Sequence, residues 1–330
     1  MTEGMSSSSA HLTRVRIQDR AFTSGDLIGV NGYRANRTLL KQRFTEGGYH
    51  LQETPHFLLC TRTAAPSTIL IHWFAPAEID ADLGNTFIRE LKPLGIISQP
   101  QQFGQVFSVV VCSLFPYDVQ RALTLYATNT LRCYRCLLAE TSDKGPRADS
   151  TISAFAAVYR RVFQLRVGER FLDAGCSFGF LPLLIAERFP FLKQVVGIDI
   201  ETESFPLVRA LAEEQQLSQV QFTQADLLAE HFPSLGMFDT VTALHILEHF
   251  TESDMYRVLF NLLQITAHRL ILAVPYEADE PERAYGHEQL FSRAKLESVG
   301  AWCVEQLGGR GMVFYEDCAG GLLLVERVTS

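Results

Sequence analysis

The sequence has little of what marks a nucleic-acid-binding, membrane-spanning or disulfide-bonded protein. Its 330 residues carry 29 Lys and Arg against 37 Asp and Glu, a formal net charge of −8, whereas a dedicated nucleic-acid binder is normally basic. No apolar run reaches the roughly 18 residues that a transmembrane helix needs. The 7 cysteines are odd in number and spread through apolar stretches, which is typical of buried thiols in a reducing compartment. Composition therefore argues against a nucleic-acid partner and against a membrane protein.

The N-terminal segment also lacks the apolar core of a signal peptide. Residues 1–11 read MTEGMSSSSAH and are expected to form a disordered polar tail. Because the sequence shows no targeting feature, a cytoplasmic location is expected.

What the sequence does contain is enough apolar material for large cores, with 47% hydrophobic residues and 23 Phe. Its one long polar interruption is ETSDKGPRADS at residues 140–150, which lies between two helical patterns. We predict a domain boundary there, with an N-terminal domain over residues 12–148 and a C-terminal domain over residues 149–330.

Charge is divided unevenly between the two halves. Residues 1–150 hold 15 basic and 13 acidic residues, whereas residues 151–330 hold 14 and 24. The second half, at a net −10, is a poor partner for a phosphate backbone.

The N-terminal domain mixes short β-like stretches with helical ones and predicts a small α/β domain of mixed order. The Val-rich residues 105–113 predict a strand, and residues 117–138 predict a long amphipathic helix. Cys133 and Cys136 have the spacing of half a zinc site, but with no second pair they are expected to be buried. No motif in this domain indicates a chemistry.

Strands and helices alternate regularly in the C-terminal domain, which predicts a doubly wound, mostly parallel sheet. A helix near residues 292–299 is expected to lead into two final strands, around residues 302–307 and 320–327.

Four segments of the C-terminal domain place polar or small residues at predicted strand ends. In FLDAGCSFG, residues 171–179, a strand ends at Asp173 and a glycine-containing turn opens directly into a helix, which favours close approach of a ligand. Asp199 ends the next strand, where a carboxylate can accept hydrogen bonds from ribose hydroxyls. Asp226 follows the third strand, where it can accept from an adenine amino group. The fourth segment, FDTVTALHILEHF, is a strand that leads to a polar tip.

In order and spacing these four segments resemble the class I S-adenosylmethionine-dependent methyltransferases, over about residues 153–328. The resemblance implies a seven-stranded sheet with a reversed final hairpin, and S-adenosylmethionine as the cofactor. Ser177 stands where a third glycine is common in that family, and serine is small enough to fit. A dinucleotide-binding fold is the rival for the turn, but it fits the later segments less well. The residues implied to contact the cofactor are Asp173, Gly175, Ser177, Gly179, Asp199, Ile200, Asp226, Leu227 and Leu244.

Three histidines are candidate catalytic bases, because methyl transfer needs a positioned nucleophile that can lose its proton. His245 and His249 would lie one turn apart on one face if a helix begins there. His287 falls in the loop after the fifth strand, which is expected to cover the active site.

The spacing of His245, Glu248 and His249, with His287 further on, also suits a divalent metal ion. It resembles the Glu-x-x-Glu-His segment that holds such an ion in the ubiquinone-pathway O-methyltransferases and the small-RNA 2′-O-methyltransferases. Here His245 replaces the first Glu, which softens the ligand set and disfavours magnesium. The alternative that Leu-Glu-His only packs and caps a helix stays open.

These observations predict an S-adenosylmethionine-dependent methyltransferase that modifies an oxygen or nitrogen of a small molecule. The N-terminal domain is expected either to complete the substrate pocket or to form a homodimer interface. Two alternatives stay open: an RNA 2′-O-methyltransferase, and a non-catalytic cofactor-binding partner subunit. Substrate turnover separates the second alternative from an enzyme, and salt-dependent RNA binding tests the first.

Overall fold

The computed structural model describes residues 20–63, 67–139, 150–230 and 232–328. The chain divides into two compact units, Met1–Asn129 and Thr130–Ser330. The division falls inside helix α4 (Val119–Ala139) and thus earlier than the predicted boundary. The expected tail and residues 140–148 of that boundary lie outside the described residues, so the division into domains stays a prediction.

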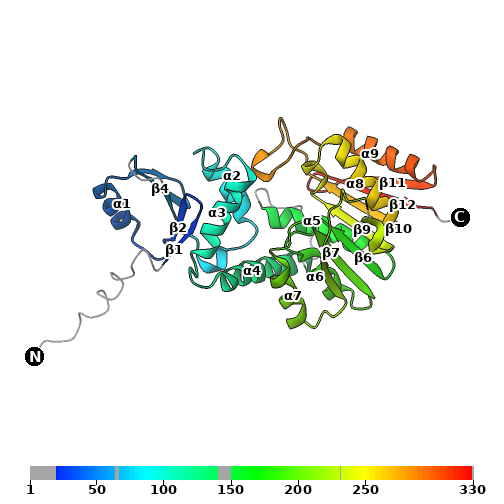
Figure 1. The fold of residues 1–330 in the computed structure, drawn as a ribbon, viewed down its shortest axis with the longest axis horizontal. Helices are drawn as coiled ribbons and strands as arrows, with labels where there is room; N and C mark the ends of the chain where they lie inside the picture. Colours follow the sequence, from blue (N-terminus) through cyan, green and yellow to red (C-terminus); the bar gives the residue numbers. More distant parts are fainter. Residues whose placement is uncertain (1–19, 64–66, 140–149, 231, 329–330) are drawn as a thin grey trace, which may run out of the picture. The chain divides into compact units, whose positions relative to one another are not determined.

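The N-terminal unit contains a five-stranded mixed sheet in the order β1-β2-β5-β4-β3. Strands β2 and β5 are parallel, and the other neighbours are antiparallel. This confirms a small α/β domain of mixed order (Figure 1). Its elements before α4 are β1 (Ala21–Ser24), β2 (Leu27–Asn31), α1 (Arg37–Glu46), β3 (His50–Glu53), β4 (Phe57–Thr61), β5 (Thr68–His72), α2 (Leu83–Leu91) and α3 (Pro100–Cys112).

The strand predicted over residues 105–113 is wrong, because α3 (Pro100–Cys112) is a helix. Pro100 occupies its first turn, where a missing N–H costs nothing, and the Gln102 side chain accepts from the Gln99 N–H at 3.2 Å. Val106, Val109 and Val110 are buried at helical spacing, and α3 packs on β1 and β2. A run of buried valines therefore gave a misleading β signal, because tertiary packing overrides the β propensity of valine.

The C-terminal unit contains a seven-stranded sheet in the order β11-β12-β10-β9-β6-β7-β8. Strand β12 runs against its two neighbours, and the other described pairs are parallel. This confirms the doubly wound sheet with a reversed final hairpin. Its elements after α4 are α5 (Thr151–Leu165), β6 (Arg170–Ala174), α6 (Phe180–Arg188), β7 (Gln194–Asp199), α7 (Phe205–Glu214), β8 (Val220–Gln224), β9 (Phe238–Leu244), α8 (Glu252–Ile265), β10 (Thr266–Val274), α9 (Arg293–Gln306), β11 (Gly311–Asp317) and β12 (Gly321–Arg327).

The chain order reverses between β6 and β9, which are neighbours in this sheet. From β6 the chain moves one way to β7 and β8, and it then returns to β9 and β10 on the other side. Because such crossovers are right-handed, helices cover both faces, with α6 and α7 against β6 to β8 and with α8 and α9 against β9 to β12 (Figure 1). Ligands of open α/β sheets bind where the order reverses, at the carboxyl ends of the strands.

The strand predicted over residues 302–307 is also wrong. Helix α9 continues to Gln306, with Leu296, Val299 and Cys303 buried at helical spacing. The helix ends where Gly308 and Gly309 adopt left-handed φ angles of 65° and 74°. The strand that pairs with β12 is β11, which lies beyond these glycines.

The cysteines are free thiols. Cys60, Cys112, Cys176 and Cys303 are buried as expected, but Cys136 is exposed and Cys133 is half-buried on α4, which corrects the expected buried pair. Among the described residues, no helix is both long and apolar enough to span a membrane.

Candidate active site

Asp173, the residue before the last one of strand β6, lies at the reversal point of the sheet. The Asp173 side chain is buried, and its Oδ1 accepts a hydrogen bond from Thr242 Oγ1 of the neighbouring strand β9 at 2.7 Å. Burial raises the pKa of Asp173 to about 7; the nearby charge of Asp199 adds to this rise, and the Thr242 hydrogen bond opposes it. The carboxyl group is thus poised to change its charge near neutral pH.

The turn between β6 and α6 bends through three left-handed residues, Gly175, Ser177 and Gly179, with φ angles of 73°, 47° and 67°. A Cβ on Gly175 would lie 2.3 Å from Ile246 Cγ2, and a Cβ on Gly179 would lie 2.4 Å from Phe222 Cε1. Glycine is required at both positions, because the φ angle is left-handed and because a Cβ would have no room. Ser177, which lies between them, is accommodated in spite of its strained φ angle.

Asp199, at the end of β7, holds this turn in place. Its Oδ2 accepts from the Ser177 N–H at 2.8 Å, and its Oδ1 accepts from the Glu201 N–H at 3.0 Å. Each carboxylate oxygen can accept a second hydrogen bond, so Asp199 can still receive two ribose hydroxyls. The neighbouring Ile200 side chain is 59% exposed and can pack on a bound ligand.

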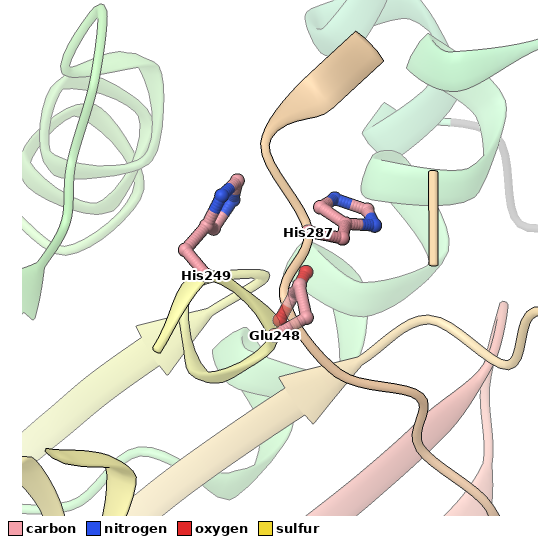
Figure 2. Close-up of side chains that lie close together, drawn as sticks. All are labelled: Glu248, His249 and His287. Atoms are coloured by element: carbon pink, nitrogen blue, oxygen red, sulfur yellow. The ribbon is translucent and has the colours of Figure 1, made fainter. Parts of the chain in front are cut away.

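A side-chain cluster of Glu248, His249 and His287 lies beyond the carboxyl end of β9. The three residues can offer donor atoms that all lie within 4.8 Å of one another. Glu248 and His249 come from a short 3-10 turn, η4 (Leu247–His249), and His287 comes from the loop between β10 and α9 (Figure 2). The structure thus brings together three of the four predicted metal ligands.

Glu248 is the unusual member of the cluster. The residue is 0% exposed, yet neither of its carboxylate oxygens has a hydrogen-bond partner among the residues that the structure describes. An unsatisfied buried carboxylate is costly unless a cation compensates it. A cation bound between the Glu248 carboxylate and the imidazoles of His249 and His287 would therefore compensate the buried negative charge.

The two imidazoles of the cluster are held through their Nδ1 atoms. Glu277 Oε1 lies 2.7 Å from His287 Nδ1, and the Gly286 carbonyl lies 3.3 Å from His249 Nδ1. Both contacts leave Nε2 free to act as a ligand or base. Although His249 reaches the surface, partial desolvation lowers its pKa, and the nearby His287 and His245 lower it further against the opposing Glu248 charge. These effects favour the neutral imidazole, which is the form that binds a metal.

His245 is the predicted ligand that lies outside this cluster. It directly follows β9 and has a left-handed φ of 54°, and its Nδ1 lies 3.6 Å from Glu248 Oε1. On its other side its ring lies 4.7 Å from the ring of Phe155 on α5. The expectation that one helix carries His245 and His249 is wrong, because α8 begins only at Glu252.

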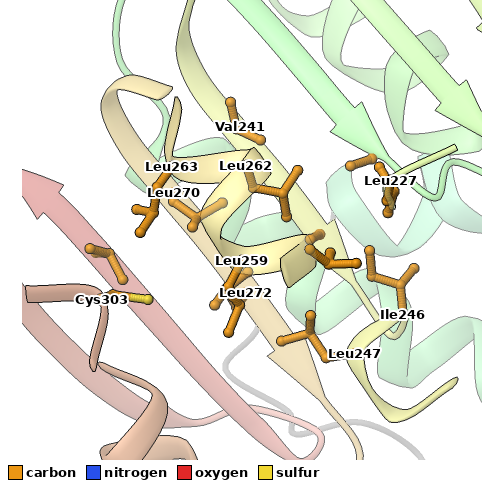
Figure 3. Packing of buried hydrophobic residues seen from close by; sticks show 14 of the residues in the cluster. Leu227, Val241, Ile246, Leu247, Leu259, Leu262, Leu263, Leu270, Leu272 and Cys303 are labelled. Atoms are coloured by element: carbon orange, nitrogen blue, oxygen red, sulfur yellow. The ribbon is translucent and has the colours of Figure 1, made fainter. Parts of the chain in front are cut away.

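The predicted adenine contacts differ in how accessible they are. Leu227 is 9% exposed and belongs to the core cluster that includes Ile246 and Leu247 (Figure 3). Leu244 is buried as well, so both leucines offer at most an edge to a ligand. Asp226 accepts from the Leu228 N–H at 2.8 Å, which leaves it lone pairs for a further donor.

Sequence reasoning missed Glu277, which orients His287, and Phe155, which contacts His245. The position of Glu277 in the same loop as His287 is the one sequence signal for it. Phe155 lies far from His245 in the chain and gives no such signal.

Comparison with known proteins gives one family match and several partial relatives. Residues 171–268 match the methyltransferase domain family. N-methyltransferase 4 of Papaver somniferum is 27% identical over 128 residues, which are 39% of this chain and 35% of that protein. The ubiquinone biosynthesis O-methyltransferase of Paracidovorax citrulli is 36% identical over 82 residues, which are 25% of this chain and 33% of that protein. This chain thus spans about a third of the length of these relatives.

Among solved structures, magnesium protoporphyrin IX methyltransferase from Synechocystis PCC 6803 with bound S-adenosylmethionine aligns with a TM-score of 0.41 and 19% identity. The alignment covers 59% of this chain and 90% of that one. The family match includes the glycine-containing turn, Asp199 and Glu248, all within the sheet described above. Residues 171–268 of the C-terminal unit thus match a methyltransferase domain, and the strand order of its sheet is the one that the resemblance to the class I methyltransferases implies.

Proposed function

We propose that this chain is a metal-assisted, S-adenosylmethionine-dependent methyltransferase that modifies an oxygen of a small molecule. A nitrogen acceptor is the second candidate, because the partial relatives include an N-methyltransferase as well as an O-methyltransferase. The observation that carries the proposal is the buried Glu248 carboxylate, which lies beside His249 and His287 and has no hydrogen bond from any part of the chain that the structure describes.

The residues at the reversal point fit the cofactor. The turn at Gly175 and Gly179 brings backbone close to the ligand, and Asp199 keeps acceptor capacity for the ribose. Asp173, buried at the base of the turn, has a pKa of about 7, so a cationic methionine part would favour its charged form. These residues would hold the cofactor at the strand ends next to the histidine cluster.

Methyl transfer from a sulfonium is an in-line displacement, so the protein mainly has to position the attacking atom. A divalent ion held by Glu248, His249 and His287 would act as a Lewis acid that lowers the pKa of a substrate hydroxyl. Glu277 fixes the imidazole of His287 for this task. His245, with its side chain 18% exposed, is placed to accept the proton as a general base.

A small molecule suits the charge of this unit better than RNA does. Residues 151–330 carry 24 acidic and 14 basic residues, and a phosphate backbone is bound through clustered cations. The RNA alternative predicts binding that weakens steeply with salt. The partner-subunit alternative predicts cofactor binding without turnover on any acceptor.

The experiment that tests the proposal is metal analysis of protein purified without chelator, followed by titration calorimetry with Mn²⁺, Co²⁺, Zn²⁺ and Mg²⁺. We expect a borderline transition metal to bind more tightly than Mg²⁺, because the donor set contains imidazoles. Glu248→Gln should weaken metal binding by at least about 100-fold, and Glu277→Gln by about 10–100-fold. Chelation should abolish methyl transfer, and the metal should restore it.

Glu252→Gln is the matched control, because Glu252 is an exposed carboxylate in the first turn of α8 and should leave metal affinity unchanged. Full activity in chelator with no bound metal would contradict metal assistance. In that case His245 or His249 acts as a plain base, and activity should fall as acid protonates the imidazole.

A further inference from the structure

Strand β11 (Gly311–Asp317) forms an edge of the seven-stranded sheet and pairs, among the described strands, with β12 alone. Its sequence GMVFYED contains no Pro and no Lys, the residues that commonly protect an edge. Met312 is 47% exposed and Phe314 is 54% exposed. An edge with bare backbone groups and exposed apolar side chains is a template for another strand.

The hydrogen bonds at the two ends of β11 decide which of its backbone groups face outward. The Arg310 carbonyl accepts from the Val328 N–H at 3.1 Å, and the Cys318 N–H donates to the Gly320 carbonyl at 3.0 Å. Even-numbered residues therefore direct their backbone groups toward β12, and odd-numbered residues direct theirs away, because direction alternates along a strand. The residues of β11 whose backbone N–H and C=O groups face outward therefore include Gly311, Val313 and Tyr315.

We propose that β11 pairs antiparallel with β11 of a second copy of this chain, about a two-fold axis at Val313. In this register Arg310 faces Glu316 of the second copy, and Met312 faces Phe314. Each contact occurs twice by symmetry, as an isologous interface requires. One cross-strand pair, Met312 with Phe314, is apolar, and the other, Arg310 with Glu316, joins opposite charges. Both kinds of pair stabilise β-sheets.

The charges at the two ends of β11 favour a second copy over an unrelated strand. Arg310 is exposed and forms no ion pair with a described residue. Glu316 has one partner, Arg161 of α5 at 2.7 Å, and its side chain remains 41% exposed. The opposite edge of the sheet, β8, lacks such a pattern, because its exposed side chains are polar: Gln221, Thr223 and Gln224.

The test is sedimentation of the full chain from about 1 to 100 µM, where a strand-paired dimer of modest area associates. We expect a concentration-dependent dimer. Phe314→Lys and Arg310→Glu should each raise its dissociation constant at least about tenfold, since the first removes the apolar pair and the second opposes two carboxylates. Val313→Pro should have the same effect, because it removes an outward N–H and leaves the ladder with β12 intact.

Phe260→Lys is the matched control, since Phe260 is a 46% exposed Phe on α8, and it should leave the dimer unchanged. Thermal melting of each variant separates dissociation from unfolding. A monomer at the highest concentration overturns the proposal. It is equally overturned if folded Phe314→Lys and Arg310→Glu dimerise like the control.

Discussion

Two buried carboxylates behave differently at the scale of single residues. The Asp173 side chain receives a hydrogen bond from Thr242, whereas within the described ranges the Glu248 carboxylate receives none. Asp173 can meet its burial cost by taking up a proton, since burial raises its pKa to about 7. Glu248 has three histidines nearby instead, so a shared cation is the natural compensation.

Asp173 should make the stability of the ligand-free protein depend on pH. Its folded pKa of about 7 lies above its ordinary value of 3.8, so the folded state binds the proton more tightly. The contribution of Asp173 to stability is therefore complete below about pH 4 and is lost as pH rises through 7. Between pH 5 and 8 the free energy of unfolding should fall by about 1–3 kcal/mol relative to Asp173→Asn. Urea denaturation of both proteins measures this, and a difference that does not change with pH contradicts it.

At the scale of elements, the turn from β6 to α6 combines strained backbone with close packing. Gly175 has a φ of 73° and leaves no room for a Cβ beside Ile246. Gly308, after α9, has a φ of 65° but has nothing within 4 Å of its Cβ position. Substituting each glycine by alanine therefore separates the free-energy cost of a left-handed φ angle from the cost of packing a Cβ against a neighbour.

Gly308→Ala should lower the free energy of unfolding by about 1 kcal/mol, the cost of a left-handed non-glycine residue. Gly175→Ala should lower it by about 2–4 kcal/mol, because overpacking adds to that cost. Thermal or urea unfolding of the two variants provides the comparison. Equal losses would show that Ile246 moves aside freely and that packing does not constrain the turn.

At the scale of the whole molecule, helix α4 contributes to both compact units. Asn129 Nδ2 donates to the Ile79 carbonyl at 3.0 Å in the first unit. In the second unit the Tyr134 ring lies 5.1 Å from that of Tyr159, and Arg135 Nε donates to Glu187 at 3.0 Å. The C-terminal unit therefore includes the second half of α4.

Two fragments test this division. A fragment of residues 119–330 should fold and bind S-adenosylmethionine. A fragment of residues 150–330 should melt several degrees lower, because it loses the Tyr134 packing and the Arg135 ion pair. Differential scanning calorimetry with and without the cofactor compares them. Identical melting would place the boundary at residue 148 after all.

The sequence by itself determined the alternation of strands and helices and the polar residues at strand ends. These features follow from local periodicity and from the rule that ligands gather where a parallel sheet reverses its order. Apolar content alone was ambiguous at residues 105–113 and 302–307, because a short apolar run suits a buried helix as well as a strand. The missing information lay in the residues that bound the two helices: Gln99 and Pro100 at the start of α3, and Gly308 and Gly309 after α9.

Only the tertiary structure decided which side chains meet. The contact of Glu277 with His287 and the environment of Glu248 depend on how the loop between β10 and α9 lies against η4. The outward face of β11 likewise depends on its register with β12. The periodicity of a segment indicates which face of a helix or strand is buried. Which residue that face contacts depends on packing and strand register, and no local sequence pattern encodes these.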